Sequence, residues 1–135
     1  MVEEALVKDV LSQETILADK TFTLLLEQSE LSVKASLWLY LTDRNLWRLI
    51  ISSESVESKG PKYVYRKIQS LLKDSESKLG GLTLNDVSVV GPRSPLAVAL
   101  GRFLRMDEVG GVRMSRNVIN GHYVEDAYVY KLSAG

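Results

Sequence analysis

A short loop, Gly91-Pro92-Arg93-Ser94-Pro95, contains the residues whose types and spacing come nearest to a binding site. Ser94 followed by Pro95 is typical of a helix start, because the serine hydroxyl accepts a backbone N–H and proline lacks the N–H that the first turn leaves unpaired. The free N–H groups of a helix start favour an anion, and the guanidinium of Arg93 stands beside them in the sequence. The loop is therefore a candidate anion or phosphate site.

A purely structural role for this loop is the simpler interpretation, since helix starts are far commoner than phosphate sites. The loop also lacks the glycine spacing and the lysine of a P-loop. Ser52 and His122 join the same candidate site if the carboxyl ends of the strands meet at one edge of the sheet. His122 is the only histidine, and no serine, threonine or carboxylate stands at a spacing that marks a triad, so we expect no catalytic residue.

The dipeptide Asn120-Gly121 is the strongest short signal for a β-hairpin, here with a type I′ turn. A two-residue turn at this point places Arg116 directly opposite Glu125. It also predicts two faces: one holds Val112, Met114, Arg116, Val118, Tyr123, Glu125, Ala127 and Val129, and the other holds Arg113, Ser115, Asn117, Asp126 and Tyr128. We interpret Arg116 and Glu125 as a structural ion pair, because perturbed functional sites are a minority of such pairs.

The chain contains no cysteine. Disulfides, thiolate zinc sites, iron–sulfur clusters and cysteine nucleophiles are therefore excluded. With a single histidine and neither a His-Glu-x-x-His nor an EF-hand pattern, we expect no metal and no other cofactor. These features favour a protein without enzymatic activity.

Seventeen Lys and Arg residues balance seventeen Asp and Glu residues, so the formal net charge is zero. A nucleic-acid-binding protein normally has a basic excess, and we expect no nucleic-acid partner, although a local basic patch stays open. No stretch approaches the ~20 apolar residues that cross a bilayer. Val2-Glu3-Glu4-Ala5 is acidic where a secretory signal is basic. We therefore expect a soluble, cytoplasmic protein that does not engage a membrane.

The hydrophobic periodicity predicts one α/β domain over residues 1–135, with the element order αββαβαββ. The first thirty residues have helical spacing, and the polar residues 12–15 predict either a kink or two shorter helices. Further helices are expected from Pro61 to Gly80-Gly81 and from Pro95, with a loop at residues 53–59. Alternating apolar residues and turn signals predict strands at 33–41, 46–52, 84–90, 112–119 and 122–132.

Two strand–helix–strand units in series imply right-handed crossovers, so we expect the second, third and fourth strands to run parallel. The two hairpins then add antiparallel partners at the ends, which gives a five-stranded mixed sheet. Residues 33–41 and 123–132 have few charges and no proline, and we expect them at the sheet edges. Unprotected edges of this kind predict a homodimer, unless the first helix covers them.

The residues match no family of known function. The leading hypothesis is a non-catalytic binding or assembly module that acts through a protein partner or by self-association. The alternative hypothesis is a small-ligand or phosphate-binding domain that uses Arg93, Ser94, Ser52 and His122 in a crevice at the carboxyl ends of the parallel strands.

Overall fold

The first helix of the computed structural model, α2 (Gln13–Glu27), begins at the polar residues that interrupt the apolar pattern of the sequence. The structure describes residues 11–75, 79, 82–119 and 121–133. Ser12 caps α2, and its hydroxyl accepts the backbone N–H of Thr15 at 3.1 Å. The polar quartet is therefore a helix start, and the part of the predicted helix at residues 1–10 lies outside the described residues.

Five strands form one mixed sheet in the order β3-β2-β1-β5-β4, and the predicted α/β class and element order are confirmed. The antiparallel hairpin of β1 (Val33–Leu41) and β2 (Leu46–Ser53) continues through β2 to β3 (Val87–Val90), which runs parallel to β2. The second hairpin, β4 (Val112–Ile119) and β5 (His122–Leu132), joins the sheet through β5, which pairs antiparallel with β1.

The prediction of three parallel strands is wrong, because the sheet has one parallel pair, β2 and β3. The fourth strand, β4, pairs antiparallel with β5 at the opposite edge of the sheet from β3. The position of β5 follows from β1, in which Leu37 and Trp38 are both buried on opposite faces of the strand. A strand that is apolar on both faces belongs in the interior of a sheet, so its second edge needs a partner.

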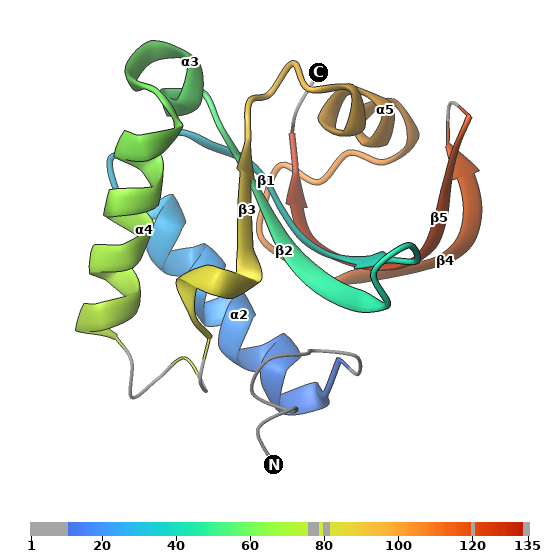
Figure 1. Ribbon diagram of the computed structural model, residues 1–135, viewed down its shortest axis with the longest axis horizontal. Coiled ribbons are helices and arrows are strands. Elements are labelled where there is room, and N and C mark those ends of the chain that lie inside the picture. Colours follow the sequence, from blue (N-terminus) through green and yellow to red (C-terminus); the bar gives the residue numbers. More distant parts are fainter. Residues whose placement is uncertain (1–10, 76–78, 80–81, 120, 134–135) are drawn as a thin grey trace.

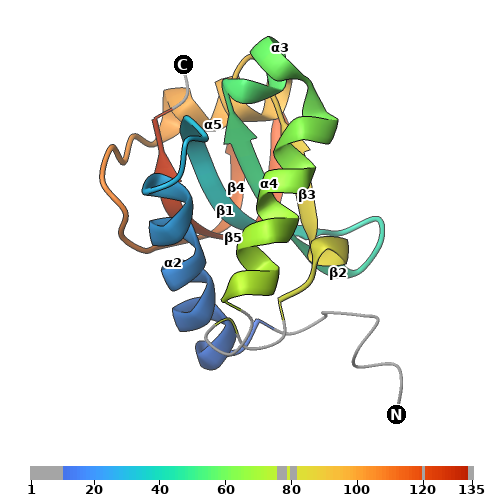
Figure 2. The ribbon, with the colours of Figure 1, turned by 90° about the vertical axis from the view of Figure 1, so that its left-hand side faces the viewer.

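Helices cover both faces of the sheet (Figures 1 and 2). The helices α2 and α4 (Pro61–Asp74) lie on one face, over β1, β5 and β3, and α5 (Pro95–Phe103) lies on the other, against β4 and β5. Pro61 and Pro95 occupy first turns as predicted, but α4 ends at Asp74, earlier than expected. The predicted loop at 53–59 contains a short helix, α3 (Ser55–Lys59), and the strand predicted at 84–90 begins with a 3-10 turn, η2 (Leu84–Asp86).

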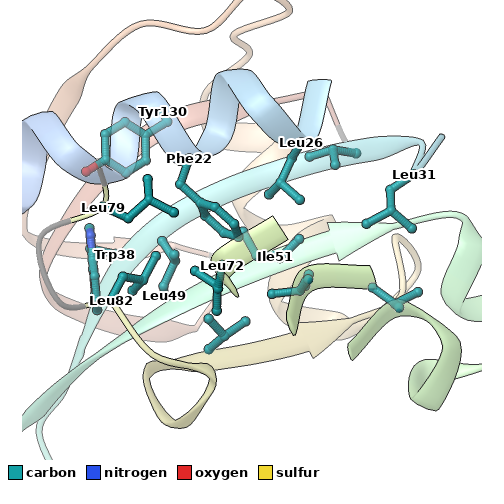
Figure 3. Close-up of a cluster of buried hydrophobic side chains, with 14 of the residues drawn as sticks. Phe22, Leu26, Leu31, Trp38, Leu49, Ile51, Leu72, Leu79, Leu82 and Tyr130 are labelled. Atoms are coloured by element: carbon teal, nitrogen blue, oxygen red, sulfur yellow. The ribbon is translucent and has the colours of Figure 1, made fainter. Parts of the chain in front are cut away.

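The sheet separates two hydrophobic clusters. Figure 3 shows the larger one, in which α2 and α4 pack on the sheet through side chains that include Phe22, Leu26, Trp38, Leu72 and Tyr130. The smaller cluster, on the opposite face, joins Ala99 and Leu100 of α5 to side chains of β1, β2, β4 and β5. Burial on both faces explains why β1 and β2 are apolar on both sides.

The edges of the sheet are β3 and β4, so the predicted edge positions of β1 and β5 are wrong. Each of those strands pairs on both sides, which is why neither needs charges for protection. β3 is only four residues long, and β4 carries Arg113 and Arg116. Short edge strands and edge charges are the usual protection against strand pairing between chains. The edges of the sheet therefore give no reason to expect a homodimer.

Candidate functional site

The loop before α5 has the predicted helix start, and its polar groups have partners within the chain. The Ser94 hydroxyl accepts the backbone N–H of Ala97 at 3.2 Å, which makes Ser94 the N-cap of α5. The Nη1 atom of Arg93 lies 2.5 Å from Oε1 of Glu57, on α3. A carboxylate therefore occupies the position beside Arg93 that an anionic ligand would take, which lowers the affinity of this loop for anions.

Ser52 and His122 do not complete the predicted crevice. Ser52 lies near the end of β2, paired with Ala35 and Val90, and it is only 1% exposed. Its hydroxyl has no hydrogen-bond partner among the described residues. His122 is the first residue of β5, at the hairpin tip, and Figure 1 shows this tip on the far side of α5 from β3. The structure therefore does not bring His122 together with the other three residues.

The register of the β4–β5 hairpin is the predicted one, with Ile119 opposite His122 and Val118 opposite Tyr123. Gly121 has a φ of 80°, as a turn glycine should, and Asn120 lies outside the described residues. Continuing this register places Arg116 opposite Glu125. Among the ion pairs of the described residues, none joins these two side chains, and Glu125 instead accepts the Tyr123 hydroxyl at 2.9 Å.

The ion pair of this hairpin is formed by Arg113 and Asp126. Two hydrogen bonds of 2.7 Å join Nε and Nη2 of Arg113 to the two carboxylate oxygens of Asp126, and the Ser115 hydroxyl donates to Oδ1 at 3.1 Å. The guanidinium holds the pKa of Asp126 below its ordinary value, and the carboxylate in turn raises the pKa of Arg113. Arg113 also lies over the ring of Trp47, with 5.6 Å between its guanidinium carbon and the ring centroid. These contacts hold β4 against the sheet.

The predicted faces of the hairpin are correct near the sheet and wrong toward the tip. Met114, Ala127 and Val129 share the buried face as expected. Beyond Arg116, however, Ile119 and Val124 are buried, while Val118 and Tyr123 are exposed. Arg116 has a φ of 54°, in the left-handed region, and this residue interrupts the alternation of faces along β4. Sequence alternation alone assumes extended backbone throughout and therefore could not detect this change.

The exchange of faces produces an exposed apolar surface, which we call the hairpin-tip surface. It consists of Phe103 at the end of α5, which is 52% exposed, and the opposed pair Val118 and Tyr123, which are 69% and 56% exposed. A hollow of about 140 Å³ adjoins it, lined by Ala99, Arg102, Phe103, Val118 and Ile119. Three large apolar side chains on neighbouring elements are typical of a surface that contacts another molecule.

A buried polar network, which the sequence analysis did not identify, connects α2 to the sheet. Asp19 is 1% exposed and accepts Nε1–H of Trp38 at 2.8 Å. The hydroxyls of Thr23 and Ser36 lie 2.8 Å apart, and the Tyr130 hydroxyl donates to the Ile16 carbonyl at 2.8 Å. Burial raises the pKa of Tyr130. The one signal in the sequence was a lone aspartate within an apolar helical stripe, and its partners come from distant strands.

Metal-binding and membrane-spanning features can be judged for the part of the chain that the structure describes. Within it, no three His, Asp or Glu side chains come together as metal ligands would. In the same residues, no helix combines the length and the apolar character needed to span a membrane.

The chain was compared with protein-family models, with curated proteins and with solved structures, and none of these comparisons gave a match.

Proposed function

We propose that the protein is a non-catalytic binding module that self-associates through the hairpin-tip surface. The observation that supports this proposal is the exposure of Phe103 and Val118 beside one hollow, with the exposed Tyr123 opposite Val118 on β5. Removal of apolar area from water stabilises a contact by about 25 cal/mol per Å², so side chains of this size are favoured anchors at an interface.

A second copy of the chain is the partner that the charge of the protein favours. The formal net charge is zero, so two copies do not repel each other as strongly charged proteins do. A two-fold axis through the hairpin-tip surface would place Phe103 of one copy near the hollow of the other, and two-fold dimers are the commonest oligomers.

The alternative function, anion binding at Arg93, Ser94, Ser52 and His122, has less support. Arg93 is paired with Glu57, the Ser94 hydroxyl caps α5, and Ser52 is buried. If the alternative were correct, millimolar phosphate would raise the melting temperature, and Arg93→Ala would abolish that rise.

Sedimentation equilibrium over about a hundredfold range of protein concentration tests the proposed self-association. We expect the average mass to rise from that of a monomer toward that of a dimer. The double variant Phe103→Gln/Val118→Thr should weaken the association by at least about tenfold, because two apolar anchors are replaced by polar side chains.

A matched control is Leu17→Gln/Leu24→Gln, which changes the two exposed leucines of α2. This variant should associate as the unmodified protein does. A chain that stays monomeric at the highest concentration would contradict the proposal, and so would association that only the α2 variant weakens.

A further inference from the structure

Basic side chains follow the outer face of α4. Lys62, Arg66 and Lys73 are exposed, and with Gln69 they occupy positions four, three and four residues apart, which places them on one side of the helix. The row from Lys62 to Lys73 is about 16 Å long at 1.5 Å per residue. Figure 1 shows α4 on the opposite side of the molecule from the β4–β5 hairpin, so this basic row is separate from the hairpin-tip surface.

The row concentrates positive charge within a chain that has none overall. Residues 55–74 contain five basic and two acidic residues, whereas the remainder of the chain contains twelve basic and fifteen acidic residues. Neighbouring carboxylates do not neutralise the row: within the described residues, Lys62, Arg66 and Lys73 form no ion pair. Other cations of the described residues do pair with carboxylates, as in Lys34–Glu54, Lys131–Glu27 and Arg105–Asp107.

Acidic side chains lie on both sides of the basic row of α4 and limit its width. On the side of α2, Glu30 lies 2.9 Å from Lys67 and accepts the Tyr63 hydroxyl, and the hydrogen bond from Lys67 keeps the pKa of Glu30 below its ordinary value. On the side of η2, Asp86 caps the 3-10 turn that packs beside α4. A narrow row between carboxylates does not suit a broad polyanion such as a bilayer or a duplex, which those carboxylates would repel.

The aromatic residues of α4 also argue against single-stranded nucleic acid. Tyr63 lies beneath the ammonium groups of Lys59 and Lys67, and the Tyr65 hydroxyl accepts the backbone N–H of Val89 at 3.0 Å. Neither ring is therefore a free platform on which bases could stack.

A hollow beside the row can receive an apolar side chain. It has a volume of about 250 Å³, lies between α4 and the turn that follows α2, and is lined by Ser29, Glu30, Lys67, Ser70 and Leu71. A partner that offers carboxylates in a narrow line, with an apolar side chain at their margin, would match both features.

We propose that the outer face of α4 binds an acidic protein segment, whose carboxylates pair with Lys62, Arg66 and Lys73 and whose apolar side chain enters the hollow beside Leu71. This inference concerns a second surface and does not depend on self-association. Each proposal can therefore fail without the other.

Fluorescence anisotropy of a labelled peptide that alternates Glu with Leu and Ser tests the inference. We expect saturable binding at low salt that weakens steeply at ~1 M salt, where the screening length falls to ~3 Å. Lys62→Glu/Arg66→Glu should weaken binding by at least about tenfold, since two attractions become repulsions. Among the described residues these side chains form no ion pair, so the melting temperature of this variant should be unchanged, which separates lost binding from lost folding.

The control Lys20→Glu/Arg44→Glu changes two exposed cations elsewhere by the same net charge. An equal loss of binding in the control would reduce the effect to net charge and overturn the inference. Tighter binding of an oligothymidylate, or of vesicles rich in phosphatidylserine, would also overturn it, because the preferred partner would then be a nucleic acid or a membrane. Leu71→Gln should lower the affinity for the peptide and leave the salt dependence of binding unchanged. If the affinity did not change, the peptide would not occupy the hollow beside Leu71.

Discussion

At the scale of single residues, the backbone at Arg116 and the ion pair of Arg113 with Asp126 determine how the closing hairpin is presented. A left-handed φ at Arg116 reverses the faces of the strand toward the tip and leaves Val118 and Tyr123 exposed. Asp126 meanwhile holds β4 through two hydrogen bonds from Arg113. The backbone at Arg116 therefore affects which side chains of β4 are exposed, and the pair of Arg113 and Asp126 holds β4 against β5.

Replacement of Arg116 tests the strain at this position. A side chain with a Cβ atom costs about 1 kcal/mol or more in the left-handed region, and glycine does not have this cost. The free energy of unfolding of Arg116→Gly, measured by urea denaturation, should therefore be about 1 kcal/mol higher than that of Arg116→Ala. Equal stabilities, or a more stable alanine variant, would show that Arg116 is not strained.

The pH dependence of stability tests the Asp126 pair. The pKa of Asp126 is lowered in the folded chain, so its stabilising effect is present above the ordinary carboxyl value of 3.8 and is lost as the pH falls through the lower, folded value. Asp126→Asn should reduce the free energy of unfolding by about 1 kcal/mol at pH 7, because the partner Arg113 is partly exposed and screened by water. The difference should disappear in strong acid.

Asp43→Asn, in the β1–β2 turn, is the control, because no ion pair of the described residues involves Asp43. It should change stability by no more than a few tenths of a kcal/mol at either pH. A pH-independent loss in the Asp126 variant would indicate a steric rather than an electrostatic effect.

At the scale of elements, α2 is held to the sheet by polar as well as apolar contacts. Trp38 of β1 donates to the buried carboxylate of Asp19, within a cluster that also contains Phe22 and Leu26. Leaving a buried polar group without its hydrogen-bond donor costs about 1–3 kcal/mol. This hydrogen bond therefore fixes the position of α2 along the sheet.

Trp38→Phe should cost about 2 kcal/mol more than Trp47→Phe in the free energy of unfolding. Both changes remove the same ring atoms from buried positions, but only the indole of Trp38 donates to a buried carboxylate. Equal losses in thermal or urea unfolding would mean that packing alone accounts for the role of Trp38.

Local elements were predictable from the sequence, whereas their arrangement in the sheet was only partly so. Ser12, Ser94 and the prolines at 61 and 95 mark helix starts by chemistry that acts within a few residues. The choice of β1 as the neighbour of β5 depends on pairing between residues almost a hundred positions apart. For the same reason the sequence did not reveal that Arg93 pairs with Glu57, because the two residues are 36 positions apart.

At the scale of the whole molecule, two surfaces face away from each other across the sheet. One is the apolar hairpin-tip surface, and the other is the basic outer face of α4. We propose that both surfaces bind protein chains, the first a second copy of this chain and the second an acidic segment. The first of these proposals, self-association through the hairpin-tip surface, predicts protection that depends on protein concentration.

Amide hydrogen exchange at a low and a high protein concentration tests that claim most directly, because it locates the contact as well as detecting it. At the high concentration, exchange should slow at Phe103, Val118 and Tyr123 and should remain unchanged along α4. Exchange rates that do not depend on concentration at these three residues, or protection confined to another surface, would contradict the account.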